Sequence, residues 1–133
     1  MVKIYCDVSC SLEDNLCAWA YIVYNEDSSP SVFRGSYTDT SNIRGELKVC
    51  LDSIEYGLKL YENIWVYTDY ADLHELYKRN GKNIFKKSPD FDIFEKIAEY
   101  IRSGKVKIKK IKSKLNPAHK YAYWELVSLR KKN

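Results

Sequence analysis

The chain has little of what marks fibrous, membrane-spanning or secreted proteins. Its 133 residues include only 5 glycines and 3 prolines, which excludes collagen-like and loop-dominated chains. No apolar run approaches the roughly 20 residues that a membrane helix needs, and Met1–Tyr5 enters a strand pattern instead of a signal peptide. Because 45% of the residues are hydrophobic, we expect one domain with a real core over residues 1–133.

Cysteine is scarce as well. The chain has four cysteines, which are Cys6, Cys10, Cys17 and Cys50. Three of the four lie within apolar strand or helix patterns. We expect buried, reduced thiols in a cytoplasmic protein, and neither disulfides nor a zinc site.

Charge is divided unevenly along the chain. Residues 1–77 contain 5 basic and 13 acidic residues, whereas residues 78–133 contain 17 basic and 5 acidic residues. An acidic working site beside a basic binding surface fits this division. The alternative is that the two sets interleave in space and neutralise each other.

Three strand patterns open the chain. Val2, Ile4, Cys6 and Val8 alternate with polar neighbours over residues 2–10, and dense apolar runs follow at residues 17–24 and 32–37. Short polar turns separate these runs, so we expect an antiparallel meander.

The rest of the chain alternates between helix and strand patterns. Ser41 or Asn42 caps a long helix, and Ser88-Pro89-Asp90 begins a later helix that ends at Gly104. The other expected elements are a buried strand at 64–67, a helix from about Leu73 to Tyr77, a lysine-rich strand at 105–112 with a bulge before Ile111, and a helix from Asn116-Pro117 to about Leu129. This order predicts an α/β fold, a mixed five-stranded sheet flanked by helices.

Three acids stand at the junctions of these elements. Asp7 lies in the first strand, Glu46 opens the long helix, and Asp69 closes the strand at 64–67. Bringing carboxylates together is unfavourable unless cations compensate their charge. Two divalent metal ions used in phosphodiester chemistry are the usual reason for such a set.

The element order and the three acids resemble the type-one branch of the ribonuclease H family. The family motifs Asp-Gly-Ser, Thr-Asn-Asn-Arg-x-Glu and Thr-Asp-Ser correspond here to Asp7-Val8-Ser9-Cys10, Ser41-Asn42-Ile43-Arg44-Gly45-Glu46 and Thr68-Asp69-Tyr70. The resemblance covers nearly the whole chain. It implies hydrolysis of the RNA strand of an RNA–DNA hybrid with two Mg²⁺ ions, for which Mn²⁺ can substitute. We expect a monomer that uses no membrane and no small-molecule organic cofactor.

The resemblance also assigns roles to residues. Asp7, Glu46 and Asp69 become catalytic metal ligands, and the substrate-binding set becomes Ser9, Cys10, Asn42 and Arg44. Asn42 would read the minor groove of the hybrid, although helix capping also accounts for it. Val8 replaces a family glycine and Ile43 replaces a second asparagine, so we expect weaker substrate contact at both positions.

The fourth carboxylate of the family, in an Asp-x-Leu-Ala pattern, is altered here. With the pattern aligned on Leu126, its acid position falls on Trp124, and Glu125 is the next residue. Either Glu125 is the fourth catalytic metal ligand or that ligand is missing. His119 is similar to a family histidine that moves a proton; the alternative is a loop histidine without such a role.

Lysines concentrate in two segments. Lys82, Lys86 and Lys87 precede Ser88, where the family has a longer basic protrusion that grips the DNA strand, and six more lysines lie between residues 105 and 114. We expect phosphate binding from the first segment. In the second, part of the charge protects an exposed sheet edge and the rest binds phosphate.

Two other functions stay open. One is a nucleic-acid or protein-binding module of the same fold with impaired catalysis, which Val8, Ile43 and the altered fourth position favour. The other is a DNA resolvase, since one fold hosts several functions. The motif that contains Asn42, Arg44 and Glu46 argues against a resolvase.

Overall fold

The computed structural model describes residues 1–131, and its sheet has the strand order β3-β2-β1-β4-β5. An antiparallel meander is formed by β1 (Val2–Ser11), β2 (Leu16–Tyr24) and β3 (Ser31–Thr38). The parallel strands β4 (Ile64–Thr68) and β5 (Val106–Lys110) extend the sheet on the other side of β1. The expected mixed five-stranded sheet is therefore confirmed.

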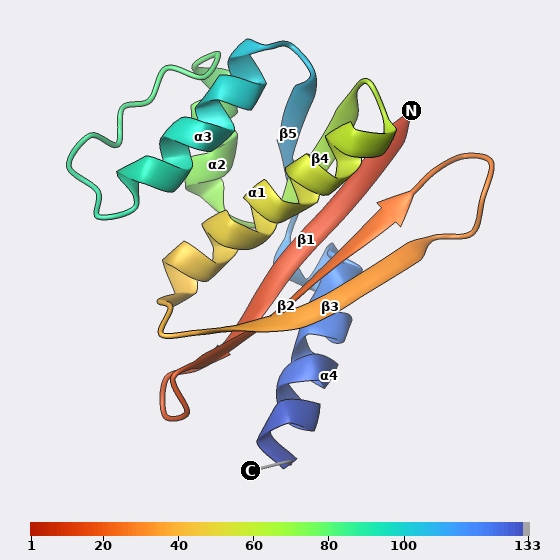
Figure 1. Ribbon diagram of the computed structural model, residues 1–133, viewed down its shortest axis with the longest axis vertical. Helices are drawn as coiled ribbons and strands as arrows, with labels where there is room; N and C mark the ends of the chain where they lie inside the picture. The colour runs from red at the N-terminus through yellow and green to blue at the C-terminus, as the bar shows by residue number, and fades with distance from the viewer. Residues whose placement is uncertain (132–133) are drawn as a thin grey trace.

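Helices pack on both faces of this sheet (Figure 1). One face is covered by α1 (Asn42–Leu60), α2 (Ala71–Lys78) and α3 (Phe91–Arg102), whereas α4 (Ala118–Lys131) packs on the other face against β1, β2 and β3. A short 3₁₀ turn, Ser113–Leu115, precedes α4. None of the helices within residues 1–131 has the length and apolarity to cross a membrane.

The main core lies between the sheet and the three helices α1, α2 and α3. Alternate side chains of β1, such as Ile4, share one apolar cluster with Leu47 of α1 and Phe94 of α3. Gly57 lets α1 approach the sheet closely, because a Cβ at this position would lie 2.8 Å from Cδ1 of Ile4. This close packing fixes α1, and with it Glu46, relative to β1.

Two element boundaries differ from the sequence prediction. Helix α3 begins at Phe91 and not at Ser88-Pro89, because Oγ of Ser88 accepts a hydrogen bond from the N–H of Asp90 (3.0 Å) and closes a turn before the helix. Strand β5 ends at Lys110 in regular register with β4. The expected bulge is wrong, because Ile111 lies beyond the end of the strand.

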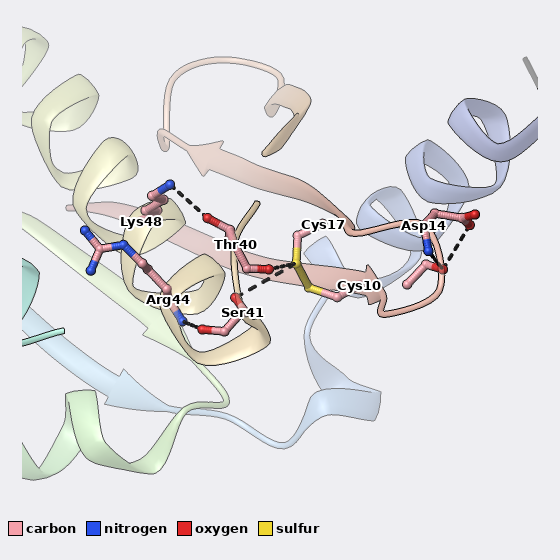
Figure 2. Close-up of a disulfide and its surroundings, with 8 residues drawn as sticks. Cys10, Asp14, Cys17, Thr40, Ser41, Arg44 and Lys48 are labelled. Atoms are coloured by element: carbon pink, nitrogen blue, oxygen red, sulfur yellow. Dashed lines mark hydrogen bonds between the residues drawn. A yellow bond between two sulfur atoms is a disulfide. The ribbon is translucent and has the colours of Figure 1, made fainter. Parts of the chain in front are cut away.

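One pair of cysteines also departs from the prediction. Cys6 and Cys50 are buried free thiols as expected, but Cys10 and Cys17 form a disulfide (Figure 2). They face each other in the β1–β2 hairpin with Cα atoms 4.0 Å apart, which only the strand register reveals. Sγ of Cys17 lies 3.6 Å from the carbonyl oxygen of Thr40, so the bridge contacts the segment that leads into α1.

Asn116 joins the start of α4 to the sheet. Its side-chain nitrogen donates a hydrogen bond to the carbonyl oxygen of Cys6 (2.9 Å), and its side-chain oxygen accepts one from the N–H of Ala118 (3.0 Å). Asn116 is itself buried. These bonds fix the first turn of α4 beside the part of β1 that carries Asp7.

Candidate functional site

Three carboxylates meet where β1, α1 and β4 come together. Asp7 lies in β1 and is 2% exposed, Glu46 lies in α1 and is 7% exposed, and Asp69 directly follows β4. One oxygen from each carboxylate lies within 4.8 Å of the others. The structure thus brings together the three acids that the sequence singled out, while their catalytic role stays a prediction.

The start of α1 sets the position of Glu46. Ser41 is the N-cap, because its Oγ accepts a hydrogen bond from the N–H of Arg44 (3.0 Å). The guanidinium of Arg44 forms ion pairs with Asp90 (3.0 Å) and Asp92 (3.1 Å) at the start of α3. Arg44 was predicted to contact substrate, but in this structure its guanidinium holds α1 against α3.

The carboxylates repel one another in a poorly hydrated site. Burial and the charge of Asp69 raise the pKa of Asp7, and a hydrogen bond from His119 opposes that rise. Burial and the charges of Asp7 and Asp69 raise the pKa of Glu46 to about 10. Glu46 is therefore protonated at neutral pH unless a cation balances the site.

The donor set fits a divalent metal ion. All three groups offer carboxylate oxygens, the hard ligands that Mg²⁺ and Mn²⁺ accept. Oε2 of Glu46 is buried and has no hydrogen-bond partner. A bound cation would satisfy this atom and would remove the electrostatic cause of the raised pKa values.

His119 lies beside the three carboxylates, at the position that we call the fourth corner of the site because the family pattern led us to expect a fourth carboxylate there. It lies in the first turn of α4, and its Nδ1 is 2.8 Å from Oδ2 of Asp7. Its side chain is 52% exposed, so the imidazole borders both the carboxylates and solvent. The expectation that His119 is a loop histidine without a role does not fit this position.

Glu125 does not reach the carboxylates. Its Oε1 lies 3.8 Å from Nε of Arg34, and Trp124 beside it is 52% exposed. Because α4 begins at Ala118, Glu125 lies roughly 9 Å further along the helix axis than His119. The proposed fourth ligand is thus misplaced, because the alignment on Leu126 sets the acid position too far into the helix.

The carboxylates line an open cleft of about 280 Å³. Its lining residues are Asp7, Val8, Asn42, Glu46, Asp69, Tyr70, Ser113 and His119. Asn42 is the first residue of α1 and faces the cleft, and because Ser41 caps the helix, the capping role considered for Asn42 is wrong. Two other predicted substrate residues, Ser9 and Cys10, continue β1 beyond Asp7 and are not among the lining residues, and the sulfur of Cys10 is in the disulfide.

The loop between α2 and α3 presents three of the predicted phosphate-binding lysines. Lys82, Lys86 and Lys87 are all exposed. The loop itself is anchored, because the ring of Phe85 stacks on that of Phe94 with centroids 4.3 Å apart. An anchored loop with exposed ammonium groups can hold a charged ligand without first becoming ordered.

Sequence reasoning missed two cleft residues and the contact of a third. Ser113 and Tyr70 line the cleft, and the hydroxyl of Tyr70 donates a hydrogen bond to Asp72 (3.0 Å). No sequence signal pointed to Ser113. For His119 a signal existed: Asn116-Pro117 marks a helix start, which places the histidine in the first turn.

A protein-family model described as RNase H matches residues 1–120. A search of curated proteins found no match. Among solved structures, RNase H1 from the halophilic archaeon Halobacterium salinarum NRC-1 has a TM-score of 0.75 at 13% identity, covering 96% of this chain and 98% of the other. The N-terminal RNase H domain of a Mycobacterium tuberculosis protein has a TM-score of 0.78 at 16% identity, with coverages of 98% and 96%. LC11-RNase H1, solved with an RNA/DNA hybrid, has a TM-score of 0.68 at 17% identity, with coverages of 88% and 89%.

Proposed function

The chain belongs to the RNase H family of nucleases, and we propose that it is a metal-dependent endonuclease that hydrolyses the RNA strand of RNA–DNA hybrids. The observation that carries the proposal is the convergence of Asp7, Glu46 and Asp69 within 4.8 Å, with a buried oxygen of Glu46 left without a partner. We also propose that it acts in the cytoplasm, as a monomer.

Asp7, Glu46 and Asp69 would hold two divalent ions, Mg²⁺ or Mn²⁺. The bound ions would lower the pKa of a water molecule and stabilise charge on the leaving oxygen. Asp7 would be the central ligand of this set, because its carboxylate interacts with Glu46, Asp69 and His119. Glu46 extends from α1, the helix that also presents Asn42 to the cleft, so in this proposal Glu46 would lie near the 2′-hydroxyl of the RNA strand.

His119 completes the site in place of the carboxylate that the family pattern led us to expect at Glu125. Its imidazole can hold a proton at Nδ1 against Oδ2 of Asp7, and can release that proton when a cation takes up the carboxylate. A neutral imidazole adds no negative charge, so this site attracts Mg²⁺ less than four carboxylates would.

The part of the hybrid that lies outside the cleft would contact positively charged side chains. Lys82, Lys86 and Lys87 are exposed on the anchored loop and would bind phosphates without regard to sequence. Arg44 is not part of this surface, because it pairs with Asp90 and Asp92.

A second candidate function is a hybrid-binding module with weakened catalysis. It is favoured by one observation, the placement of Glu125 against Arg34, which leaves the fourth corner without a carboxylate. In this alternative the fold binds the hybrid but holds the second ion poorly.

One assay separates the two candidates. Labelled RNA–DNA hybrid, duplex DNA and duplex RNA are incubated with the protein and Mg²⁺ or Mn²⁺. We expect cleavage of the hybrid alone, abolished in Asp7→Asn and retained in Asp27→Asn, an exposed acid that serves as the matched control. Tight binding of the hybrid without cleavage in either metal would support the module and contradict the enzyme.

A further inference from the structure

One end of the sheet face that carries α4 has no helix over it. Helix α4 packs against β1, β2 and β3, and in Figure 1 it extends away from the N-terminal end of β1. The first residues of β1, together with β4 and β5, therefore present two neighbouring rows of side chains outward within the described residues 1–131.

Aromatic rings and lysines alternate across this uncovered end. The backbone register puts them in two neighbouring rows: Tyr24, Lys3, Trp65 and Lys107 in the first, and Ile22, Tyr5, Tyr67 and Lys109 in the second. Ile22 is buried against Ala118 and Ala122 of α4, and Tyr5 and Tyr24 border that cluster, so the uncovered part begins at these two rings. We call the four rings and three lysines of these rows the aromatic–lysine face. The strands carry no acid in either row.

The rings of this face support one another. Tyr5 stacks on Tyr67 with centroids 4.5 Å apart and meets Tyr24 edge to face at 5.4 Å. All four rings of the face keep part of their surface exposed. Rings held by their neighbours need little further ordering when a flat ligand stacks on them.

Positive charge is concentrated on one ring. The ammonium groups of Lys107 and Lys109 lie 4.7 Å and 4.5 Å from the ring centroid of Trp65. Two like charges on one ring attract an anion more strongly than either charge alone. Protection of the edge strand β5 explains lysines at these positions, but it does not explain the aromatic rings beside them.

A groove of about 550 Å³ continues the face. Its floor includes Lys3, Tyr5 and Tyr24, and its wall includes Ile111 and Leu115 from the segment before α4. Ser113 of the same segment and His119 of α4 line the carboxylate cleft. The one acid of the groove, Glu26, is paired with the N-terminal ammonium at 3.0 Å.

We propose that the aromatic–lysine face binds single-stranded nucleic acid, with bases stacked on the rings and phosphates on the lysines. Rings interleaved with ammonium groups are the recurrent chemistry of single-strand binding without sequence preference. The inference goes beyond the proposed function, because the face lies outside the carboxylate cleft and needs no metal. It would hold an unpaired strand that extends from the cleft.

The test measures binding in EDTA, so that cleavage plays no part. Labelled oligothymidylate and oligouridylate are titrated into the intact chain, and binding is followed by anisotropy. The double variant Lys107→Gln/Lys109→Gln is compared with Lys59→Gln/Lys96→Gln, which removes the same charge from exposed positions on α1 and α3. We expect the first pair to lower affinity by about tenfold at low salt, and the control pair to change it by less than about twofold.

Two further measurements sharpen the test. Binding by three lysines gives a slope of about −2 in a plot of log affinity against log salt concentration. In the Lys107/Lys109 variant we expect this slope to become shallower, about −0.7. Tyr67→Leu keeps an apolar side chain but loses stacking, and we expect a loss of about fivefold or more. Thermal unfolding establishes that each variant is folded before its affinity is compared.

Three results would overturn the proposal. One is equal affinity in the Lys107/Lys109 variant and the control pair. Another is concentration-dependent self-association that the Lys107/Lys109 variant abolishes, which would make the face a contact between copies of the chain. The third is binding to anionic lipid vesicles without binding to either oligonucleotide.

Discussion

His119 and Asp7 are 112 residues apart in the sequence, and Nδ1 of the imidazole lies 2.8 Å from Oδ2 of the carboxylate. This contact makes the fourth corner of the cleft an imidazole. The site therefore holds three carboxylates and one group that is neutral or positive. Its affinity for divalent ions, and its choice among them, should reflect that composition.

Replacing the imidazole by a carboxylate should strengthen Mg²⁺ binding. In His119→Asp we expect Mg²⁺ affinity to rise by about tenfold or more, because a negative charge is added within a few ångströms of the ion. His119→Asn should not show this gain, since it adds no charge. Calorimetric titration of the metal-free proteins measures both, and equal affinities in the two variants would argue against His119 as the fourth corner.

Glu125→Gln should leave the metal site unchanged. Glu125 lies 3.8 Å from Arg34 and not with the three carboxylates, so removing its charge should leave Mg²⁺ affinity and hybrid cleavage within about twofold of wild type. The matched change Glu46→Gln should abolish cleavage. A loss of metal affinity in Glu125→Gln would show that the glutamate reaches the ions after all.

The metal-free protein should become less stable as pH rises. Between the ordinary pKa of 4.5 and the folded pKa of about 10, Glu46 ionises in the unfolded chain but stays protonated in the folded one. The unfolded state then binds fewer protons, so the free energy of unfolding falls with pH by at most about 1.4 kcal/mol per pH unit from this one group. The raised pKa of Asp7 adds to the fall at its acidic end.

Urea unfolding in EDTA at a series of pH values measures this slope. Glu46→Gln cannot ionise and should flatten it, whereas the exposed control Asp27→Asn should not. Saturating Mg²⁺ should flatten it as well, because the ion stabilises the ionised carboxylates. A slope that persists unchanged in Glu46→Gln would assign the pH dependence to other groups.

The Cys10–Cys17 disulfide should stabilise the fold. It closes a loop with a sequence separation of 7, for which restriction of the unfolded chain predicts about 2 kcal/mol. We expect Cys10→Ser/Cys17→Ser, or reduction of wild type, to lower the free energy of unfolding by about that amount. Cys50→Ala changes a buried free thiol and is the control in which reductant should have the same effect as in wild type.

The basic loop should carry salt-dependent affinity for the hybrid. Changing Lys82, Lys86 and Lys87 to Gln removes three exposed charges, so the slope of log affinity against log salt should become shallower by about 2 to 3. Arg44→Gln should leave that slope unchanged, because its partners are Asp90 and Asp92. Filter binding in Ca²⁺ or EDTA over a salt series measures both.

The fold and the three acids were accessible from the sequence because local patterns encode them. Period-two alternation defines β1, helical spacing defines α1, and each acid lies beside such an element. The disulfide was not accessible, because Cys10 and Cys17 become neighbours only through the hairpin register. The ion pairs of Arg44 were hidden for the same reason, since Asp90 and Asp92 lie at the start of α3, which is distant in the sequence.

The fourth corner shows how motif alignment can mislead. Leu126 suggested that the acid position falls at Trp124 or Glu125, but the three-dimensional position depends on where α4 begins. Asn116 fixes that start through its bonds to Cys6 and Ala118, and so brings His119 to Asp7. Side-chain bonds of this kind across the fold leave no periodic signal in the sequence.

The bond from Asn116 to Cys6 spans 110 residues, which has a consequence for synthesis of the protein. The ribosome makes β1, α1, β4 and Asp69 before the segment that closes the cleft, so all three carboxylates precede it. A nascent chain that ends before His119 therefore carries the carboxylates but lacks the imidazole and the first turn of α4. The complete cleft forms only after that segment has emerged from the ribosome.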